Sequence, residues 1–217
     1  YYAAFGNFDF DITDRLTATV GARFQRDEFD YRIQGGGDLG AAIAALVPGT
    51  NPVVPSFSGT ESISNDEVTG KAALTYALSD DSNIYASYAR GYKGPGMDAP
   101  ANARSFNGSP LLEEYVDAYE IGFKSTLMDN RATFNATLFW QEFENLQQRA
   151  FDPEEAVLKA INAGDSRQRG LEIDAQFYAT EYLTLTANVV YLDAEYTDFQ
   201  NADCFSPRIE DVNCEYT

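Results

Sequence analysis

Residues 16–24 read LTATVGARF, a strict alternation of apolar side chains with polar or very small ones. Successive side chains of a β-strand point to opposite faces of the sheet, so residues two apart share a face. The stretch therefore predicts a strand with one apolar face. That face is made of Leu16, Ala18, Val20, Ala22 and Phe24.

The same period of two returns along the whole chain. It recurs in seven further stretches, at 2–12, 68–78, 84–88, 115–127, 132–141, 171–177 and 183–191. A tilted strand needs about 9 to 11 residues to cross a bilayer, and most of these stretches approach that length. The sequence therefore predicts an all-β protein of eight antiparallel strands.

The connections between the predicted strands are sorted by length. Four are tight turns, at 13–14, 79–82, 128–130 and 180–182, and they are rich in the Asp, Asn and Ser that turns favour. Between them lie long connections at 34–64, 94–112 and 150–161, and a long tail follows at 200–217. All long connections thus fall at one end of an up-and-down meander. This asymmetry is typical of a transmembrane β-barrel with short periplasmic turns and long extracellular loops.

The composition excludes several classes of function. The 217 residues carry 15 basic and 34 acidic side chains, a net charge of −19, which disfavours a nucleic-acid partner. Histidine is absent, so a Ser-His-Asp triad or a His-ligated zinc site cannot be completed within these residues. No stretch approaches the about 18 apolar residues of a membrane helix.

The polar faces of the predicted strands hold the candidate lumen residues. In a membrane barrel the apolar face meets lipid and the polar face lines a wet interior. We expect the lumen to be lined by Arg23, Glu120, Lys124, Glu172 and Asp174. Pairs of carboxylates on one face could also serve acid–base chemistry, but no nucleophile accompanies them, so we expect a polar lining and no catalytic residue. Trp140 and Tyr191 would lie in an outer aromatic girdle.

One long connection concentrates cationic and aromatic residues in this acidic chain. Such a cluster can hold an anionic or aromatic ligand, although interface tyrosines and solvated lysines would give the same pattern. The candidate ligand-binding residues are Arg90, Tyr92, Lys93, Met97, Arg104 and Phe106.

The two cysteines lie near the end of the sequence. Cys204 and Cys214 are separated by nine residues, too far apart for a C-x-x-C metal or redox motif. A disulfide that closes a short exposed loop is one interpretation and implies an oxidising compartment. Two unpaired thiols remain the alternative.

Several stretches resemble TonB-dependent outer-membrane receptors, in the order in which that family has them. These stretches are LTATVGARF at 16–24, YASYARGYKGPG at 85–96, YEIGFKS at 119–125, FNATLFW at 134–140, and NAG at 162–164 followed by RGLE at 169–172. The resemblance implies a 22-stranded barrel with a plugged lumen, monomeric and without a cofactor. It also implies an outer-membrane receptor that imports scarce nutrients such as iron–siderophore chelates, powered by the inner-membrane TonB complex. Cobalamin, glycans and aromatic compounds remain possible cargoes.

The resemblance covers only part of such a receptor. Neither the N-terminal TonB box, nor the plug domain, nor a closing strand with a terminal aromatic residue is recognisable in residues 1–217. We therefore interpret residues 1–217 as one partial barrel domain, eight strands from the middle of the barrel. In this interpretation long loops capture the ligand, the plug moves, and the ligand passes through the polar lumen without covalent chemistry.

Three alternatives stay open at this point. A passive porin or small closed barrel predicts eight strands that close on themselves. A secreted barrel that binds lipid or ligand predicts solubility without detergent and polar residues outside. A barrel hydrolase would need catalytic residues beyond those present.

Overall fold

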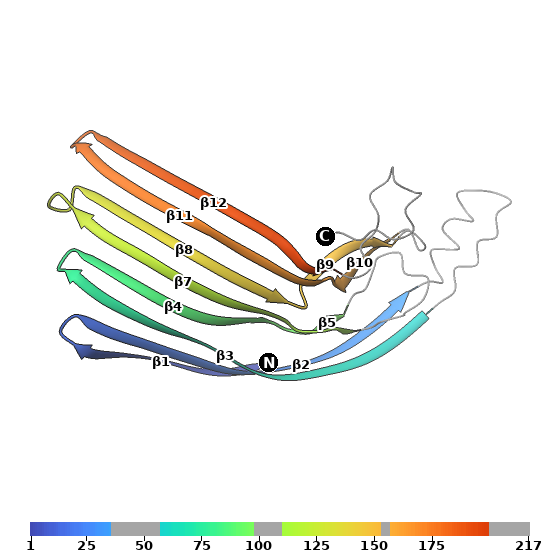
Figure 1. Ribbon diagram of the computed structural model, residues 1–217. Coiled ribbons are helices and arrows are strands. Elements are labelled where there is room, and N and C mark those ends of the chain that lie inside the picture. Colours follow the sequence, from blue (N-terminus) through green and yellow to red (C-terminus); the bar gives the residue numbers. More distant parts are fainter. Residues whose placement is uncertain (36–56, 98–109, 153–156, 200–217) are drawn as a thin grey trace, which may run out of the picture.

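The computed structural model describes residues 1–35, 57–97, 110–152 and 157–199, and they form twelve β-strands (Figure 1). The strands are β1 (Tyr2–Thr13), β2 (Leu16–Gly35), β3 (Phe57–Ser79), β4 (Ser82–Lys93), β5 (Gly96–Met97), β6 (Pro110–Leu111), β7 (Glu114–Leu127), β8 (Ala132–Glu144), β9 (Gln147–Asp152), β10 (Val157–Asn162), β11 (Gly164–Thr180) and β12 (Leu183–Phe199). No helix long and apolar enough to cross a membrane occurs in these ranges.

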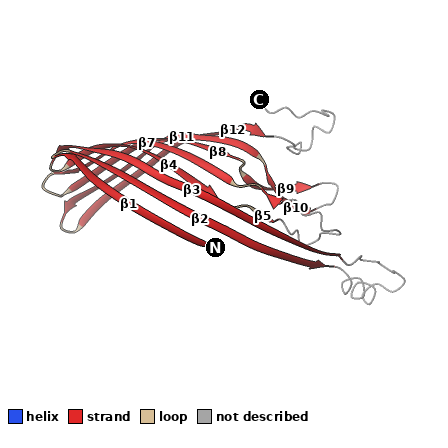
Figure 2. Cartoon of the chain, turned by 90° about the horizontal axis from the view of Figure 1, so that it is seen from below, coloured by secondary structure: helices blue, strands red, loops and turns tan. Residues whose placement is uncertain are grey.

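Eight of the strands form one antiparallel sheet in the order β1-β2-β3-β4-β7-β8-β11-β12. Each strand pairs with its predecessor in the meander, and the sheet curves into an open trough (Figure 2). The four short turns lie together at one end, and the strand ends that lead into the long connections lie at the other (Figure 1). The predicted eight-stranded meander with sorted connections is confirmed, as an open sheet whose edges are β1 and β12.

The strands reach further toward the long connections than the alternation indicated. β2 and β3 pair continuously until Gly35 lies opposite Phe57, so residues 57–64, predicted as loop, belong to β3. The other two long connections also contain paired strands, β5 with β6 and β9 with β10. In residues 57–64 most side chains are polar or small on both faces, with Phe57 and Ile63 the exceptions, so the sequence shows no clear apolar face there.

The sheet has no conventional core among the described residues. Ala163 is the hydrophobic residue that is buried there, at 1% exposure, whereas Phe8, Ile121 and Leu138 are more than half exposed. These exposed side chains all belong to the apolar face predicted from the alternation. A single layer with a bare apolar face requires a nonpolar surrounding, which a bilayer supplies.

Two glycines, one in each of the stretches YEIGFKS and RGLE, leave room for aromatic rings on the polar face of the sheet. The ring of Tyr85 in β4 lies across Gly122 of β7, and the ring of Phe139 in β8 lies across Gly170 of β11. A Cβ at either glycine would overlap the neighbouring ring. The glycines of YEIGFKS and RGLE therefore allow close packing between adjacent strands.

Candidate functional site

The five predicted lumen residues share one face of the sheet. Directly opposed residues of paired strands lie on the same face, and the register of the strands connects the candidates in this way. Lys124, Asn135, Asp174 and Asn188 form one transverse row across β7, β8, β11 and β12. Gly122, Thr137 and Glu172 form the adjacent row. The lumen-lining role of these residues stays a prediction.

Contacts on this polar face are local. The Tyr85 hydroxyl lies 3.4 Å from the Glu120 carboxylate and 3.2 Å from the Thr137 hydroxyl. The Lys124 ammonium lies 5.1 Å from the centroid of the Tyr85 ring, at cation–π distance. Arg23 donates to Gln25 over 3.0 Å. The face is thus a polar surface with local hydrogen bonds.

The predicted ligand-binding cluster is divided in the structure. Arg90, Tyr92 and Lys93 lie within β4 and Met97 lies in β5, whereas Arg104 and Phe106 fall outside the described residues. The Arg90 guanidinium is paired with Asp117 over 2.7 Å, 4.7 Å from the centroid of the Tyr115 ring. The four described candidates therefore do not form one cationic pocket, and their ligand-binding role stays a prediction. Cys204 and Cys214 also lie outside the described residues.

At the long-connection end, β3 parts from β4. Their pairing ends where Gly70 lies opposite Arg90, while β3 continues to pair with β2 as far as Phe57. Residues 24–35 of β2 and 57–69 of β3 consequently extend the sheet beyond the end of the β3–β4 pairing, and we call this extension the β2–β3 arm (Figure 1). No backbone ladder holds the arm to β4, so side chains must do so.

Two tyrosines bridge this gap. The Tyr92 hydroxyl donates to Asp27 over 3.2 Å and accepts from Asn65 over 2.8 Å. The Tyr115 hydroxyl donates to Glu67 over 2.7 Å, and the two rings lie 5.7 Å apart between centroids. We call Asp27, Asn65, Glu67, Tyr92 and Tyr115 the tyrosine latch. Asp27 is only 5% exposed, and its buried carboxylate accepts from the Tyr92 hydroxyl of the latch and, over 3.0 Å, from the neighbouring Gln25 carboxamide.

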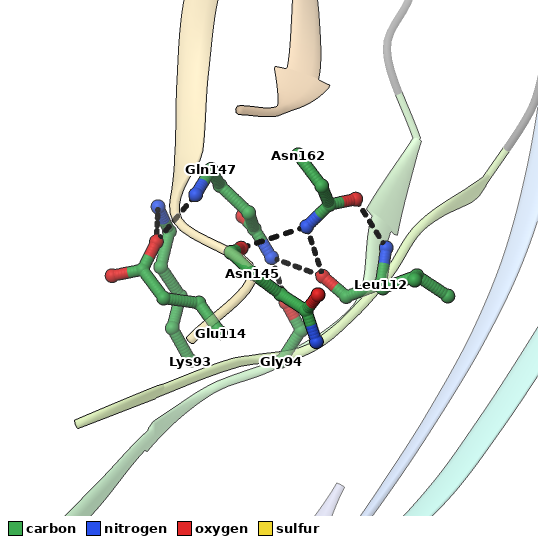
Figure 3. A network of polar contacts seen from close by, with 7 residues as sticks. All are labelled: Lys93, Gly94, Leu112, Glu114, Asn145, Gln147 and Asn162. Carbon is green, nitrogen blue, oxygen red and sulfur yellow. Dashed lines mark hydrogen bonds and ion pairs between the residues drawn. The ribbon is translucent and has the colours of Figure 1, made fainter. Parts of the chain in front are cut away.

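A second network, which we call the Asn162 clasp, joins the other long connections. The Asn162 carboxamide donates to the carbonyl oxygens of Leu112 and Asn145, over 3.1 and 2.8 Å. Its oxygen accepts the Leu112 backbone N–H over 2.8 Å. One side chain thus ties the segment before β7 to the segment after β8 (Figure 3).

Gln147 and Glu114 complete the clasp. The Gln147 carboxamide donates to the carbonyl oxygens of Gly94 and Leu112, over 3.0 and 2.9 Å. The Glu114 carboxylate accepts the Gln147 backbone N–H at 2.8 Å and the Lys93 ammonium at 3.4 Å (Figure 3). Lys93 therefore acts in this network as a partner of an acidic side chain.

The NAG motif places Asn162 in the clasp. Ala163 is buried, and its N–H donates to the Leu146 carbonyl over 2.8 Å, while the Leu146 N–H donates to Gly164 over 2.7 Å. Gly164 has φ of +114°, and a Cβ there would overlap the Asp198 backbone of β12. Glycine is the residue that accepts this backbone without strain.

Sequence reasoning missed most of these residues. Asp27, Glu67 and Gln147 belong to no recognisable motif, because each is one of many polar residues at the long-connection ends of the strands. Asn162 was recognised as part of a motif but not as a side chain that binds two other segments. No group of three or more His, Cys, Asp or Glu in the described ranges is arranged to hold a metal ion. The site is therefore a set of polar attachments that fixes the long connections around one end of the trough.

Comparison with known proteins identifies the family. The family model described as TonB dependent receptor-like, beta-barrel, matches residues 1–208. A probable TonB-dependent siderophore receptor, PiuA, of Acinetobacter baumannii is 28% identical over 137 residues, which cover 61% of this chain and 18% of that protein. The ferric-pyoverdine 358 receptor of Pseudomonas putida is 26% identical over 168 residues, or 76% of this chain and 18% of that protein.

Solved structures show the same fold. The crystal structure of the ferric yersiniabactin uptake receptor FyuA from Yersinia pestis matches with a TM-score of 0.70 and 23% identity, over 90% of this chain and 27% of that one. The chain spans 18% of the length of each of the two curated relatives above. The fold class, the resemblance and the outer-membrane location predicted from the sequence are confirmed. The chain belongs to the TonB-dependent receptor β-barrel family of the outer membrane.

Proposed function

We propose that the protein containing this chain captures a scarce nutrient at its long-connection end and imports it through the barrel, with an iron–siderophore chelate as the cargo. The observation that carries this proposal is the convergence of the β2–β3 arm, the β5–β6 hairpin and the β9–β10 hairpin at one end of the trough. The tyrosine latch and the Asn162 clasp attach these extensions. Binding residues are often placed on loops that a rigid scaffold positions.

The family relationship supports the cargo. The relatives include a probable siderophore receptor and a ferric-pyoverdine receptor, so iron–siderophore chelates are the substrate class that recurs among them. The proposal extends to the partner named by the family, the TonB complex of the inner membrane. The work is differential binding followed by an energised conformational change, with no covalent step and no cofactor.

In this proposal the cargo moves along the polar face of the sheet. Arg23, Glu120, Lys124, Glu172 and Asp174 would line the lumen or contact a plug. A ligand that leaves the loops would meet alternating donors and acceptors along this face. Weak, distributed contacts of this kind let a solute move without being held at one position.

Uptake of iron tests the proposal directly. Cells that express the full-length protein, and lack their own ferric-siderophore receptors, are given radioactive iron bound to catecholate, hydroxamate or mixed-ligand siderophores. The proposal expects saturable uptake of at least one chelate and its loss when TonB is inactivated. Unsaturable uptake that persists without TonB would support the passive porin. TonB-dependent uptake of cobalamin or a glycan, with none of iron, would keep the receptor and overturn the cargo.

The tyrosine latch provides a matched variant for the same assay. Tyr92→Phe combined with Tyr115→Phe removes both hydroxyls and keeps both rings. If the arm must be held for capture, the concentration of chelate for half-maximal uptake should rise. Tyr182→Phe, at the short-turn end and 90% exposed, removes a hydroxyl far from the long connections and should leave uptake unchanged.

A further inference from the structure

The polar face of β2 carries an oriented chain of hydrogen bonds. Arg23, Gln25 and Asp27 are spaced two residues apart and therefore share that face. Arg23 Nε donates to the Gln25 carboxamide oxygen over 3.0 Å, and Gln25 Nε2 donates to the Asp27 carboxylate over 3.0 Å. The reverse orientation of the amide would set donor against donor and acceptor against acceptor, so Gln25 bonds to both neighbours in this orientation alone. A predicted lumen residue is thus connected to the tyrosine latch.

Asp27 also ends a second chain, which comes from the other side of the gap between β3 and β4. The Asn65 carboxamide donates to the Tyr92 hydroxyl over 2.8 Å, and this hydroxyl donates to Asp27 over 3.2 Å. Because Asp27 is 5% exposed, water does not readily replace a donor that its carboxylate loses. The free energy that holds the arm against β4 therefore depends on the donors of both chains.

The latch is continuous with the Asn162 clasp. A Cβ at Gly94 would lie 3.5 Å from both the Asp27 carboxylate and the Tyr92 hydroxyl, so the backbone of Gly94 lies close against the latch. The carbonyl oxygen of Gly94 accepts from Gln147 of the clasp over 3.0 Å (Figure 3). One connected set of contacts therefore extends from Arg23 on the polar face to the arm and to the segments that the clasp joins.

Arg23 is the group in this set that another partner can draw away. Its partners among the described residues are neutral: the Tyr1 hydroxyl, the Gln25 oxygen, and the rings of Tyr1 and Phe5, whose centroids lie 6.0 and 5.9 Å from the guanidinium carbon. Four other arginines contact carboxylates, namely Arg26, Arg90, Arg167 and Arg169. Hydrogen bonds between two charged groups are stronger than those to a neutral oxygen, so an anionic group that reaches Arg23 takes it from Gln25.

We propose that Gln25 couples the polar face at Arg23 to the β2–β3 arm, so that an anionic group at Arg23 loosens the tyrosine latch. While Arg23 donates to Gln25, its charge polarises the amide and strengthens the bond to Asp27, because successive hydrogen bonds of one chain reinforce each other. When Arg23 turns to an anion, the amide loses both this polarisation and the partner that fixes its orientation. The arm then opens more often across the gap, where no backbone ladder joins it to β4.

This coupling rests on the function proposed above in one respect, that the polar face lines the path of the cargo. In that function the arm would stay closed over captured cargo and would be released once an anionic group of the cargo passes Arg23. The coupling itself is a property of the unloaded protein, so it can be measured without cargo.

The distance between the arm and the sheet reports the opening. Nitroxide labels are attached at Ser62→Cys in the arm and at Ile121→Cys in β7, both exposed positions outside the chain of hydrogen bonds, in full-length protein freed of its other cysteines. Pulsed electron paramagnetic resonance in detergent then gives the ratio of open to latched arm. Arg23→Met removes the donor to Gln25 and should raise this ratio about fivefold, as expected for the loss of one hydrogen bond.

Two further variants test the route through Gln25. Gln25→Met should also open the arm, and adding Arg23→Met should then change little, because the connection is already broken. Lys71→Met removes a cation from the same face of the adjacent strand, opposite Gly21, and should leave the arm latched.

A carboxylate introduced beside Arg23 supplies the anion without any ligand. Phe5 lies directly opposite Arg23 on β1 and is 79% exposed, so Phe5→Glu places a carboxylate within reach of the guanidinium. This variant should open the arm about as much as Arg23→Met does. Phe5→Gln removes the same ring without adding charge and should open the arm less.

Several outcomes would overturn the coupling. They are equal opening in Phe5→Glu and Phe5→Gln, the full effect of Arg23→Met persisting in the Gln25→Met background, opening in Lys71→Met, and an unchanged ratio in Arg23→Met. Tyr92→Phe combined with Tyr115→Phe should lengthen the distance, and a failure to do so would show that the latch does not hold the arm. Each variant is first shown to be folded by its resistance to sodium dodecyl sulfate before heating. Loss of coupling with normal iron uptake, or the reverse, separates this proposal from that of the cargo.

Discussion

Replacement of Asn162 by alanine should loosen the long connections without unfolding the sheet. The substitution removes three hydrogen bonds at once: two donated by the carboxamide to Leu112 and Asn145, and one accepted from the Leu112 N–H. It leaves the ladders of β7, β8 and β11 intact, because these pair through their backbones. The effect is therefore local opening of the segments that the clasp joins.

The size of the effect follows from the hydrogen bonds that the substitution removes. A typical intramolecular hydrogen bond contributes about 1 kcal/mol net, which gives about 3 kcal/mol for three bonds. Leu112 is 55% exposed, so water can replace part of what its backbone groups lose. We therefore expect the free energy of local opening to fall by about 2 kcal/mol, which corresponds to about 30-fold faster exchange.

Hydrogen–deuterium exchange of the full-length protein in detergent measures this opening. The amide of Leu112 and the peptide that contains Asn145 should exchange faster, while the amides of β7 and β8 near the short turns keep their protection. Asn162→Asp serves as a second variant. It retains an acceptor for the Leu112 N–H, so the Leu112 amide should stay more protected than in Asn162→Ala.

A matched control removes the same carboxamide elsewhere. Asn7→Ala changes an exposed position on β1 and should leave exchange at Leu112 unchanged. If Asn162→Ala leaves the Leu112 amide as protected as in the unaltered protein, the clasp does not hold these segments. If Asn7→Ala accelerates the same amide equally, the effect is a general loss of stability and the reasoning fails.

Three further outcomes are expected. Tyr115→Phe removes a hydrogen bond to the charged Glu67, worth about 1.5 to 3 kcal/mol, and should accelerate exchange in residues 57–69 at least tenfold; unchanged exchange would show that the arm does not depend on the latch. Gly164→Ala places a side chain at a φ of +114° against the backbone of β12, so the folded, heat-modifiable form should be largely lost on gel electrophoresis. In Gly122→Val the new side chain overlaps the ring of Tyr85, so the free energy of unfolding measured in urea should fall by about 1 to 3 kcal/mol. Adding Tyr85→Ala should restore part of the lost stability. If it does not, the strain lies elsewhere.

The alternation of apolar and polar side chains predicted the sheet, because a strand that crosses a bilayer needs an apolar face toward the lipid. Each strand within the membrane must present an apolar face to lipid, and the period of two in 16–24 or 183–191 records that demand. The β2–β3 arm lies outside this constraint. Residues 57–64 pair with β2 through their backbones, and apart from Phe57 and Ile63 their side chains are polar or small, so their order alone does not distinguish them from a loop.

The residue types in the sequence indicate candidates for the site, but they do not indicate which side chains these candidates contact. The sequence marks Arg90 as a cation in an acidic chain, and the structure pairs it with Asp117, 27 residues later in the sequence. The sequence marks Lys93 in the same way, and the structure places it beside Glu114. The pairing depends on strand register, which a sequence of alternating residues does not specify at the extended ends.

What the sequence determined by itself was the eight strands of the main sheet, their two faces and the end at which the long connections gather, since all three follow from local periodicity and turn residues. Only the tertiary structure decided that Asp27 meets Tyr92 across the gap between β3 and β4, and that Asn162 ties Leu112 to Asn145. These contacts join residues 17 to 65 positions apart in the chain. The physical reason is that periodicity reports which face a side chain occupies, whereas partnership requires the registers of several strands to be fixed together.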